Sequence, residues 1–267
     1  MKELTLEELK EIEFEILKVF DAFCKENDIK YFLSHGTLLG AIRYKKFIPW
    51  DDDVDLLIPR DDYNRMITLF KDTDRYKLFA FEKDNKYRYP FAKLCDMTTR
   101  KDEYDYNNGV ELGVDIDLFP LDAWDKDLEK AMLEVKYIRK NMSFLRLLKL
   151  KEPDSVNPVK RILKGAIMLI LKALGSKLFI NNIIKASVKD EQINNKYLGC
   201  KSWCVYGEKG IIPAEVFSET AEIEFEGEMF PAPKDYDTYL TCLYGDYLPE
   251  PPPEKRQTHH DFIAYKI

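Results

Sequence analysis

A run of aspartates near residue 50 has the composition of a metal-binding site. Residues 49–58 read Pro-Trp-Asp-Asp-Asp-Val-Asp-Leu-Leu-Ile, so a group of carboxylates leads directly into an apolar strand. In a strand, Asp53 and Asp55 point to the same face and lie about 6.6 Å apart along the chain. Carboxylate oxygens are the ligands that Mg²⁺ and Mn²⁺ prefer. The run therefore predicts a divalent-metal site, although solvated acidic turns have a similar composition.

A second acidic strand offers a third carboxylate. Residues 114–122 read Val-Asp-Ile-Asp-Leu-Phe-Pro-Leu-Asp, which places Asp115 and Asp117 on one face of an apolar strand. A carboxylate on a neighbouring strand can complete a metal site or accept the proton of an attacking hydroxyl. The residues alone leave open whether Asp115 or Asp117 does so. An edge strand with a solvated acidic face would show the same alternation.

The turn at residues 34–37, Ser-His-Gly-Thr, is a candidate phosphate contact. A short strand ends here and a short helix begins, and the N-terminus of a helix attracts phosphates through its free N–H groups. Gly36 would permit close approach of the backbone, and Thr37 would offer a hydroxyl. Arg43, at the end of the same helix, could also reach a phosphate. A plain strand-to-helix turn and a surface salt bridge are the alternatives.

The elements that must position these side chains follow from hydrophobic periodicity and helix-breaking residues. Thr5 and Glu8 form a capping box, which begins a helix predicted over residues 6–26. The other expected elements are strands at 31–33, 54–58, 76–81, 89–95 and 110–119, a short helix at 37–43, a helix capped by Asp61 or Asp62 that runs to about residue 71, a helical region from 128, and a helix at 235–244. This order predicts an α+β fold with a small mixed sheet flanked by helices, and it argues against a barrel or a sandwich.

The charge distribution divides the chain into three regions. Residues 136–189 hold 13 basic residues and two acids, a net charge of +11, so the rest of the chain carries −18. We expect a core at 1–125, a basic helical insertion at 126–195, and a C-terminal segment at 196–267 that completes the core and the active site. The overall charge of −7 argues against a nucleic-acid partner, which requires a basic face.

The basic segment predicts an anionic partner on one side of the molecule. Its stretch at 158–174 is rich in aliphatic residues but too short and too charged to span a membrane. It resembles helices that lie at a membrane surface, and a packed helix with snorkelling lysines is the alternative. The opening MKELTLEELKEIE lacks the apolar stretch of a signal peptide, and the five scattered cysteines suit a reducing compartment. We therefore expect a cytoplasmic protein that can contact the inner face of the membrane.

The Gly-Thr turn, the Asp-x-Asp strand and the later acidic strand together have the layout of the nucleotidyltransferase superfamily. More specifically, the chain resembles the LicD family, which includes fukutin-related proteins. The stretches that carry this resemblance are 36–43, 48–55, 117–122, 244–247, 251–256 and 259–260. The resemblance as a whole extends from the first helix almost to the end of the chain, and it is weakest over 126–195.

The resemblance implies a nucleotidyltransferase-like core and a metal-dependent phosphocholine transferase. The donor would be CDP-choline or another CDP-alcohol, such as the CDP-ribitol that relatives use. The acceptor would be a cell-surface glycan such as a teichoic acid precursor, presented on a lipid carrier, and CMP would be released. Asp53, Asp55 and Asp117 fall on the metal-binding and catalytic positions of the family. Lys93 matches a family lysine that could bind phosphate, and Lys255 and Arg256 could do likewise.

A choline headgroup is a quaternary ammonium, which proteins hold in cages of aromatic side chains. The candidates are Trp50, Tyr87, Tyr89, Tyr104, Tyr106, Trp203 and Tyr206. Aromatic residues at strand spacing are also typical of a hydrophobic core, so each of these residues has that alternative.

Two other functions remain compatible with the residues. The first is a cytidylyltransferase that makes a CDP-alcohol from CTP and releases pyrophosphate. The second is a non-catalytic module that binds a metal or a nucleotide and tethers a membrane complex. The sequence does not determine the alcohol of the donor, the acceptor hydroxyl or the oligomeric state.

Overall fold

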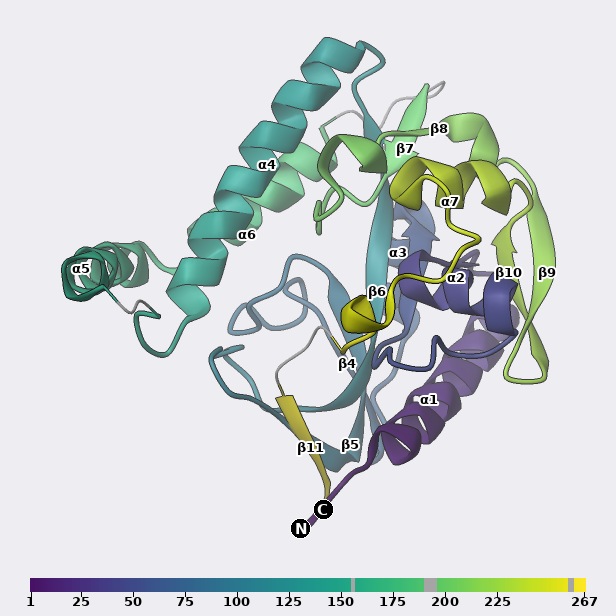
Figure 1. The fold of residues 1–267 in the computed structure, drawn as a ribbon, viewed down its shortest axis with the longest axis horizontal. Coiled ribbons are helices and arrows are strands. Elements are labelled where there is room, and N and C mark those ends of the chain that lie inside the picture. Colours follow the sequence, from purple (N-terminus) through teal and green to yellow (C-terminus); the bar gives the residue numbers. More distant parts are fainter. Residues whose placement is uncertain (155–156, 190–195, 259–261) are drawn as a thin grey trace.

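A mixed β-sheet forms the centre of the protein in the computed structural model, which describes residues 1–154, 157–189, 196–258 and 262–267. The order along the main sheet is β1-β11-β5-β6-β3-β2, with β4 paired to β5, β7 paired to β6 and β8 paired to β7 (Figure 1). β9 and β10 form a separate antiparallel hairpin. The strands are β1 (Lys2–Glu3), β2 (Phe32–Leu33), β3 (Asp55–Pro59), β4 (Tyr76–Phe79), β5 (Ala92–Glu103), β6 (Leu112–Trp124), β7 (Tyr197–Gly199), β8 (Ile212–Pro213), β9 (Thr220–Phe225), β10 (Glu228–Pro233) and β11 (Phe262–Lys266).

Helices flank this sheet. The α-helices are α1 (Leu6–Asn27), α2 (His35–Tyr44), α3 (Arg60–Leu69), α4 (Leu128–Lys149), α5 (Pro158–Leu174), α6 (Ser176–Ser187) and α7 (Tyr236–Tyr244), with short 3₁₀ turns at Gly207–Gly210, Ala214–Phe217 and Pro253–Lys255. The capping box predicted at the start of α1 is confirmed, because the Thr5 side chain accepts from the Glu8 backbone and the Glu8 side chain accepts from the Thr5 backbone. α1 packs on β5 and β6, and α3 packs against β3 and β6. The prediction of an α+β fold with a mixed sheet flanked by helices is thus confirmed.

Strand β3 begins at Asp55, one residue later than predicted, and Asp53 lies two residues before it. On one side β3 pairs with β2, where Leu33 stands opposite Leu56. The backbone N–H of Ser34 still donates to the Asp55 carbonyl at 3.1 Å, but the chain then turns into α2. Residues before Asp55 therefore have no strand beside them on that side. As a result Asp53 lies in the segment that leads into the strand and not in the strand itself.

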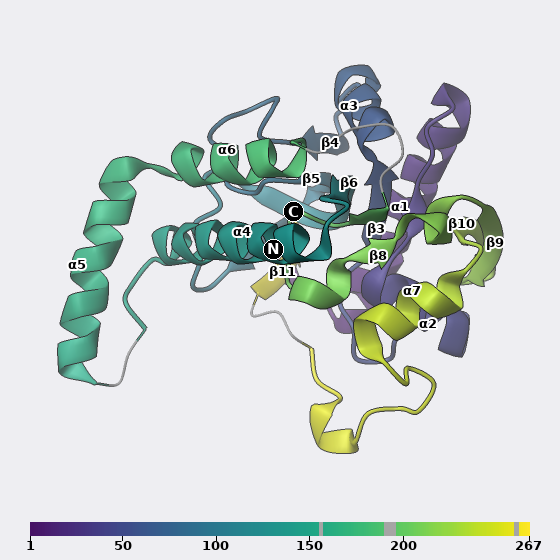
Figure 2. The same ribbon diagram turned by 90° about the horizontal axis from the view of Figure 1, so that it is seen from above.

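The basic segment forms its own layer of helices. α4 and α6 pack together, and with Trp124 at the end of β6 they bury a second hydrophobic cluster that includes Val135, Ile138 and Ile183. α5 projects from the end of this pair, as two perpendicular views show (Figures 1 and 2). In the described parts of the chain, no single helix has both the length and the apolar composition to cross a membrane. α5 and α6 meet such a criterion only when joined, and they are bent by 73°. The three-region division at 125 and 195 stays a prediction.

Candidate functional site

Three neighbouring strands carry charged residues in one row. β3 and β6 run parallel with Asp55 opposite Asp117, and β6 runs antiparallel to β5 with Asp117 opposite Lys93. Because residues directly opposite each other in a sheet project to the same face, these three side chains lie on one side. The register of the sheet therefore brings together residues that are up to 62 positions apart in the chain.

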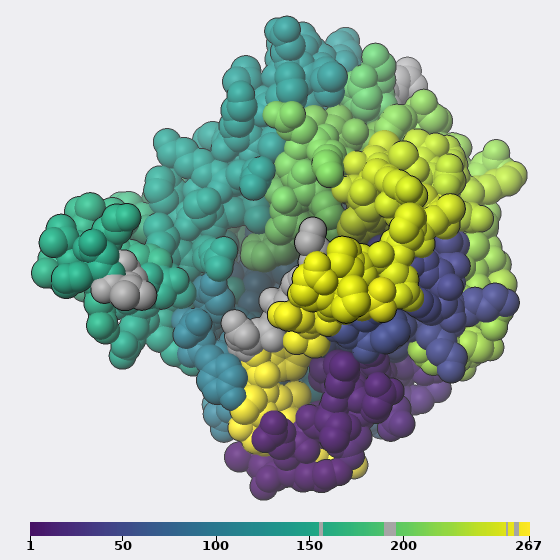
Figure 3. All heavy atoms as spheres, viewed as in Figure 1, coloured from purple at the N-terminus to yellow at the C-terminus, as the bar shows by residue number. Residues whose placement is uncertain are grey.

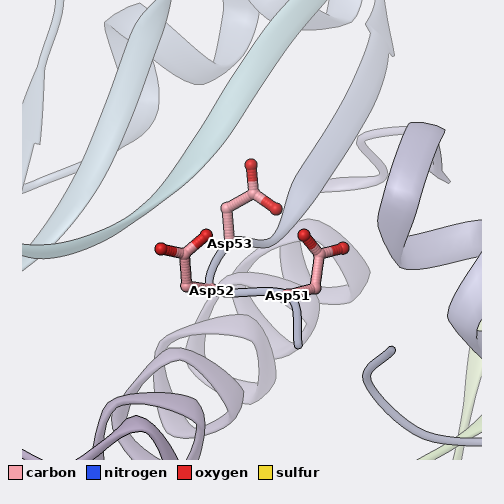
Figure 4. A group of neighbouring side chains, drawn as sticks. All are labelled: Asp51, Asp52 and Asp53. Atoms are coloured by element: carbon pink, nitrogen blue, oxygen red, sulfur yellow. The ribbon is translucent and has the colours of Figure 1, made fainter. Parts of the chain in front are cut away.

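The acidic turn before β3 gathers three carboxylates. Ligand oxygens of Asp51, Asp52 and Asp53 all lie within 4.8 Å of one another. Figure 4 shows the three carboxylates on the same side of the turn. The turn forms because the Asp51 backbone N–H donates to the Ile48 carbonyl at 3.0 Å, which folds the run back on itself. Asp53 thus has Asp51 and Asp52 as close neighbours, in addition to the Asp55 that the sequence pairs with it.

The acidic turn and the strand row act on one another electrostatically. The pKa of Asp55 is raised well above its usual value, first by burial and then by the charges of Asp53, Asp117 and Asp51, against a smaller lowering by Lys93. Carboxylates that crowd together in this way resist ionisation unless a cation neutralises them. Hard divalent cations take such oxygen ligands, so the donor set at this position fits Mg²⁺ or Mn²⁺.

The start of α2 positions these acids. The Thr37 hydroxyl accepts a hydrogen bond of 2.8 Å from the backbone N–H of Asp55. A Cβ atom on Gly36 would lie 2.6 Å from Oδ2 of Asp51, so glycine permits the close approach of the turn to the acidic run. Both residues were predicted as phosphate contacts on the basis of the helix N-terminus. In the structure they contact the acidic turn and the start of β3, and their phosphate role stays a prediction.

Lys93 lies between two carboxylates. Its Nζ is 2.6 Å from Oδ1 of Asp115 and also forms an ion pair with Asp117, and Lys101 lies 3.2 Å from the other oxygen of Asp115. Burial raises the pKa of Asp115, but Lys101 and Lys93 lower it more, so the net change is downward. For Asp117 burial outweighs Lys93, and the pKa is raised. The Asp117 side chain is 17% exposed against 2% for Asp115, so Asp117 is the more accessible of the two acids.

A cavity of about 310 Å³ lies between this face of the sheet and helix α4. Its acidic lining residues are Asp53, Glu103, Asp105, Asp115 and Asp117. Its basic lining residues are Lys93, Lys101, Arg146 and Lys149. Its remaining lining residues are Tyr89, Phe91, Tyr106, Met142, Leu145, Trp203 and Phe262. One cavity therefore presents carboxylates, cations and aromatic faces.

The aromatic wall of the cavity already contacts the amine of a lysine side chain. The Trp203 ring centroid lies 6.0 Å from that of Tyr89 and 5.3 Å from that of Phe91. Nζ of Lys149 lies 3.2 Å from the centroid of Tyr89 and 5.7 Å from that of Tyr106. A cation over an aromatic face is attracted by the ring quadrupole, so this wall has the properties that a quaternary ammonium requires.

The structure separates the seven cage candidates. Tyr89, Tyr106 and Trp203 line the cavity. Tyr87 is fully buried in the main core, whereas Tyr104 is 55% exposed. The two others, Trp50 and Tyr206, pack against Arg256 and His35 respectively. Only tertiary packing could distinguish these residues, because the local sequence does not show which aromatic side chains meet across the fold.

Arg43 was predicted to reach a phosphate, but its guanidinium is directed elsewhere. It donates to the backbone carbonyls of Tyr247 and Pro249, the second at 2.9 Å. Among the described residues, Arg43 is not part of the cavity lining. The contacts instead fasten the C-terminal segment to α2, since a guanidinium can donate to several carbonyls at once.

Only some of the predicted C-terminal site residues lie in the part of the chain that the structure describes. The guanidinium carbon of Arg256 lies 5.5 Å from the ring centroid of Trp50, and Arg256 pairs with Glu250 at 2.8 Å. Because Trp50 directly precedes the acidic run, this contact places Arg256 next to that run. The side chain of Lys255 and the motif at 259–260 lie outside the described residues.

Two buried residues beside the acids were missed. His35 has a left-handed backbone (φ 45°), its ring stacks on Tyr206 at 5.3 Å, and its Nδ1 lies 3.6 Å from Asp55. Burial lowers the pKa of His35 to about 4, so its imidazole is neutral at pH 7. Glu13 of α1 is fully buried, and its pKa is raised well above the usual value. Burial is the main cause, and Asp53 and two other nearby acids add to it, whereas the charge of Lys101 acts in the opposite direction. Glu13 has no sequence signal, and His35 stands in the predicted turn at 34–37 without a role of its own, because the surroundings of each depend on elements distant in the chain.

The protein thus combines an α+β fold with an acidic cluster that lies beside a cavity with cationic and aromatic walls. The chain belongs to the LicD family. A family model described as LicD/FKTN/FKRP, nucleotidyltransferase domain, matches residues 28–144. The lipopolysaccharide cholinephosphotransferase LicD of Haemophilus influenzae is 32% identical over 276 residues, which cover 99% of each chain.

Two shorter matches are to uncharacterized proteins. One, from Rickettsia prowazekii, is 28% identical over 112 residues, which cover 35% of this chain and 42% of that protein. The other, from Rickettsia typhi, is 36% identical over 61 residues, which cover 22% of this chain and 20% of that protein. The membership in the LicD family that the sequence motifs predict is thus confirmed.

Proposed function

We propose that this protein transfers phosphocholine from CDP-choline to a hydroxyl group of a cell-surface glycan and releases CMP. The observation that carries this proposal is the composition of the cavity beside the acidic cluster. A CDP-choline donor presents a diphosphate and a quaternary ammonium, and transfer of its phosphoryl group requires charge neutralisation. The cavity supplies acids for a metal, lysines for phosphate oxygens and aromatic faces for the ammonium. The H. influenzae relative is named a cholinephosphotransferase, which supports phosphocholine as the transferred group.

A divalent metal, Mg²⁺ or Mn²⁺, would be held by Asp53 and Asp55 with a third carboxylate from Asp117, on a nucleotidyltransferase-like core. The crowding of acids that raises the pKa of Asp55 supports this assignment. The close neighbours Asp51 and Asp52 offer further oxygens. When bound, such an ion neutralises the phosphate oxygens that gain charge during transfer.

The chain's own residues then position the groups that react. The acceptor oxygen attacks the phosphorus that bears choline, the bond from that phosphorus to the CMP oxygen breaks, and CMP leaves. Asp117 accepts the proton of the acceptor hydroxyl, because it lines the cavity and is more exposed than Asp115. Lys93 fixes Asp115 and Asp117 by its two ion pairs. Tyr89, Tyr106 and Trp203 hold the choline headgroup and so select the donor.

The acceptor is a cell-surface glycan, with a lipopolysaccharide or a teichoic acid precursor as the two candidate classes. The named substrate of the H. influenzae relative is a lipopolysaccharide. We place the reaction in the cytoplasm at the inner face of the membrane. All five cysteines lie in the described residues as free thiols, which suits a reducing compartment.

Release of CMP tests this proposal directly. Purified protein is incubated with CDP-choline, CDP-ribitol and CDP-glycerol, with Mg²⁺ or Mn²⁺ and with lipopolysaccharide or teichoic acid acceptors. We expect CMP from CDP-choline, and we expect EDTA to abolish its release. Asp53→Asn should lower the rate about a thousandfold, because it removes a charge-stabilising carboxylate from the site. Asp61→Asn, an isosteric change at an exposed position on α3, is the matched control and should leave the rate unchanged.

Other products would identify other functions. Pyrophosphate released from CTP and phosphocholine in the same assay would show a cytidylyltransferase. CMP from CDP-ribitol or CDP-glycerol alone would retain the transferase and overturn the choice of choline. Equal activity of Asp53→Asn and the unchanged protein would contradict the acidic site. Binding of donor without any product, with every acceptor class present, would indicate the non-catalytic module.

A further inference from the structure

Helix α5 stands apart from the rest of the molecule. Its 17 residues, Pro158–Leu174, span about 25 Å. It contacts α4 and α6 and meets α6 at a bend of 73°. In the space-filling view its segment forms a separate lobe at the left edge of the molecule (Figure 3). Most of its circumference is therefore open to the surroundings.

One narrow side of α5 faces the protein. Met168 and Leu171 are its buried residues. Lys164, which lies between them around the helix axis, forms an ion pair with Asp154 in the preceding segment. At 100° per residue these side chains fall within roughly 60° of one another. This side alone is sufficient to attach α5 to α4 and α6.

The opposite side of α5 is apolar and exposed. At 100° per residue it forms an uninterrupted apolar arc of about 160°. The arc consists of Val159, Ile162, Leu163, Ala166, Ile167, Leu169, Ile170, Ala173 and Leu174, all of which are exposed. The side chains of Ile162 and Leu169 are 75% and 72% exposed. Helices of soluble proteins ordinarily bury their apolar stripe, whereas α5 directs it away from the body.

The charges around this apolar arc indicate what covers it. Lys160 and Lys172 are exposed and lie one at each border between the arc and the attached side. They belong to the segment 136–189, whose net charge is +11. An interfacial helix has this arrangement, with its apolar face in the acyl boundary and its lysines at the headgroups. A phosphate-bearing lipid surface complements both features at once.

We propose that α5 docks the protein on an anionic lipid bilayer. The apolar arc enters the boundary between headgroups and acyl chains, and Lys160 and Lys172 contact lipid phosphates. The docking surface stands on α5 by itself. Its use in bringing a lipid-borne acceptor to the cavity rests on the proposed transferase reaction.

Vesicle flotation of the full chain tests this surface. The vesicles contain phosphatidylethanolamine with phosphatidylglycerol, or phosphatidylethanolamine with phosphatidylcholine as the neutral counterpart. Free phosphocholine is present in excess throughout, so that lipid headgroups do not report on the cavity. We expect binding to the anionic vesicles at least tenfold above the neutral ones. The double variant Lys160→Gln/Lys172→Gln should lose about 25-fold in binding, since each basic residue near the surface contributes about fivefold.

A matched pair of variants tests the apolar arc. Ile162→Glu/Leu169→Glu places two charges in the arc and should lower binding at least tenfold. Leu128→Glu/Leu133→Glu makes the same change at two exposed positions of α4, which are 48% and 62% exposed, and should bind like the unchanged protein. Asp53→Asn should also bind normally. Vesicle binding is measured without donor, so it does not depend on the transferase reaction. Loss of vesicle binding with normal CMP release would contradict only the docking surface, and normal binding without CMP release would contradict only the proposed reaction.

Two results would overturn the proposal. The first is an unchanged protein that does not float with anionic vesicles. The second is equal flotation of the α5 variant and the α4 variant. Should the unchanged protein sediment as a dimer, and Ile162→Glu/Leu169→Glu as a monomer, while neither floats, the apolar arc would be an interface between two copies of the chain.

Discussion

At the residue scale, Trp203 illustrates how a side chain acquires a role through its neighbours. It has no distinguishing feature in the sequence, yet it packs on Tyr89 and Phe91 at the wall of the cavity. Nζ of Lys149 lies 3.2 Å from the Tyr89 ring centroid of this wall. Under the proposed reaction, the wall distinguishes choline from uncharged alcohols, because only a cation is attracted by the ring faces.

We therefore predict that Trp203→Ala weakens binding of CDP-choline about tenfold and leaves binding of CDP-glycerol nearly unchanged. Trp203→Phe keeps an aromatic face and should lose little. Isothermal titration calorimetry with the two donors gives the ratio of dissociation constants. An equal loss for both donors would show that Trp203 supports the cavity as a whole and does not recognise the headgroup.

At the scale of elements, the contact between the start of α2 and the acidic turn determines where the carboxylates lie. Gly36 is in a helix, where alanine is ordinarily more stable by about 0.5–1 kcal/mol. Its Cβ would nevertheless lie 2.6 Å from Asp51. Glycine at this position therefore leaves room for the Asp51 side chain, although it lowers the helix propensity of α2.

Replacing Gly36 by Ala should displace Asp51 and lower CMP release at least tenfold, with a higher metal concentration needed for half-maximal rate. Gly165→Ala in α5 is the control, since its nearest neighbour, Pro153, would lie at an ordinary 3.6 Å. That variant should keep full activity with a soluble acceptor. The measurement is CMP release as a function of Mn²⁺ concentration. An unchanged metal dependence in Gly36→Ala would refute the role assigned to this contact.

At the scale of the whole molecule, the cavity lies between the sheet and helix α4, whose C-terminal turn packs against Tyr89 and Tyr106. This packing buries Lys149 against Tyr89, leaving it 5% exposed. Burial lowers the pKa of Lys149 from 10.5 to about 7, although Glu103 opposes this change. Between these two values the unfolded chain binds more protons than the folded one, so the free energy of unfolding rises with pH over this range. The cost of a charged Lys149 in the folded protein therefore lowers the free energy of unfolding in full below pH 7, and it disappears above about pH 10.5.

Lys149→Met should therefore stabilise the protein by a few kcal/mol at pH 7, and the gain should shrink by about 1.4 kcal/mol for each pH unit above that. Urea unfolding at pH 7 and pH 9 measures the difference. Lys136→Met, at an exposed position of the same helix, should give no comparable gain. An equal gain in the free energy of unfolding at both pH values would show that the charge of Lys149 does not destabilise the folded protein.

Local sequence was sufficient for several elements and for the family. The capping box at Thr5 fixed the start of α1, and the helix at 235–244 differs from α7 by one residue. β5 and β6 were underestimated. β5 continues to Glu103 through polar residues that pair with β11, and β6 continues through a largely apolar segment to Trp124, where it pairs with β7. Strand pairing stabilises such residues independently of their own hydrophobic pattern, and that pairing is not visible in a single segment.

The sequence by itself determined that Asp53 and Asp55, with either Asp115 or Asp117, are the candidate acids, because each lies in a short motif with a strong local pattern. Only the tertiary structure decided that Asp117 stands opposite Asp55, that Lys149 closes the cavity, and that the apolar arc of α5 faces outward. A hydrophobic period shows that a helix has an apolar face but not which face the rest of the molecule covers. Register and packing depend on contacts between segments far apart in the chain, and those contacts form only when the sheet and helices assemble.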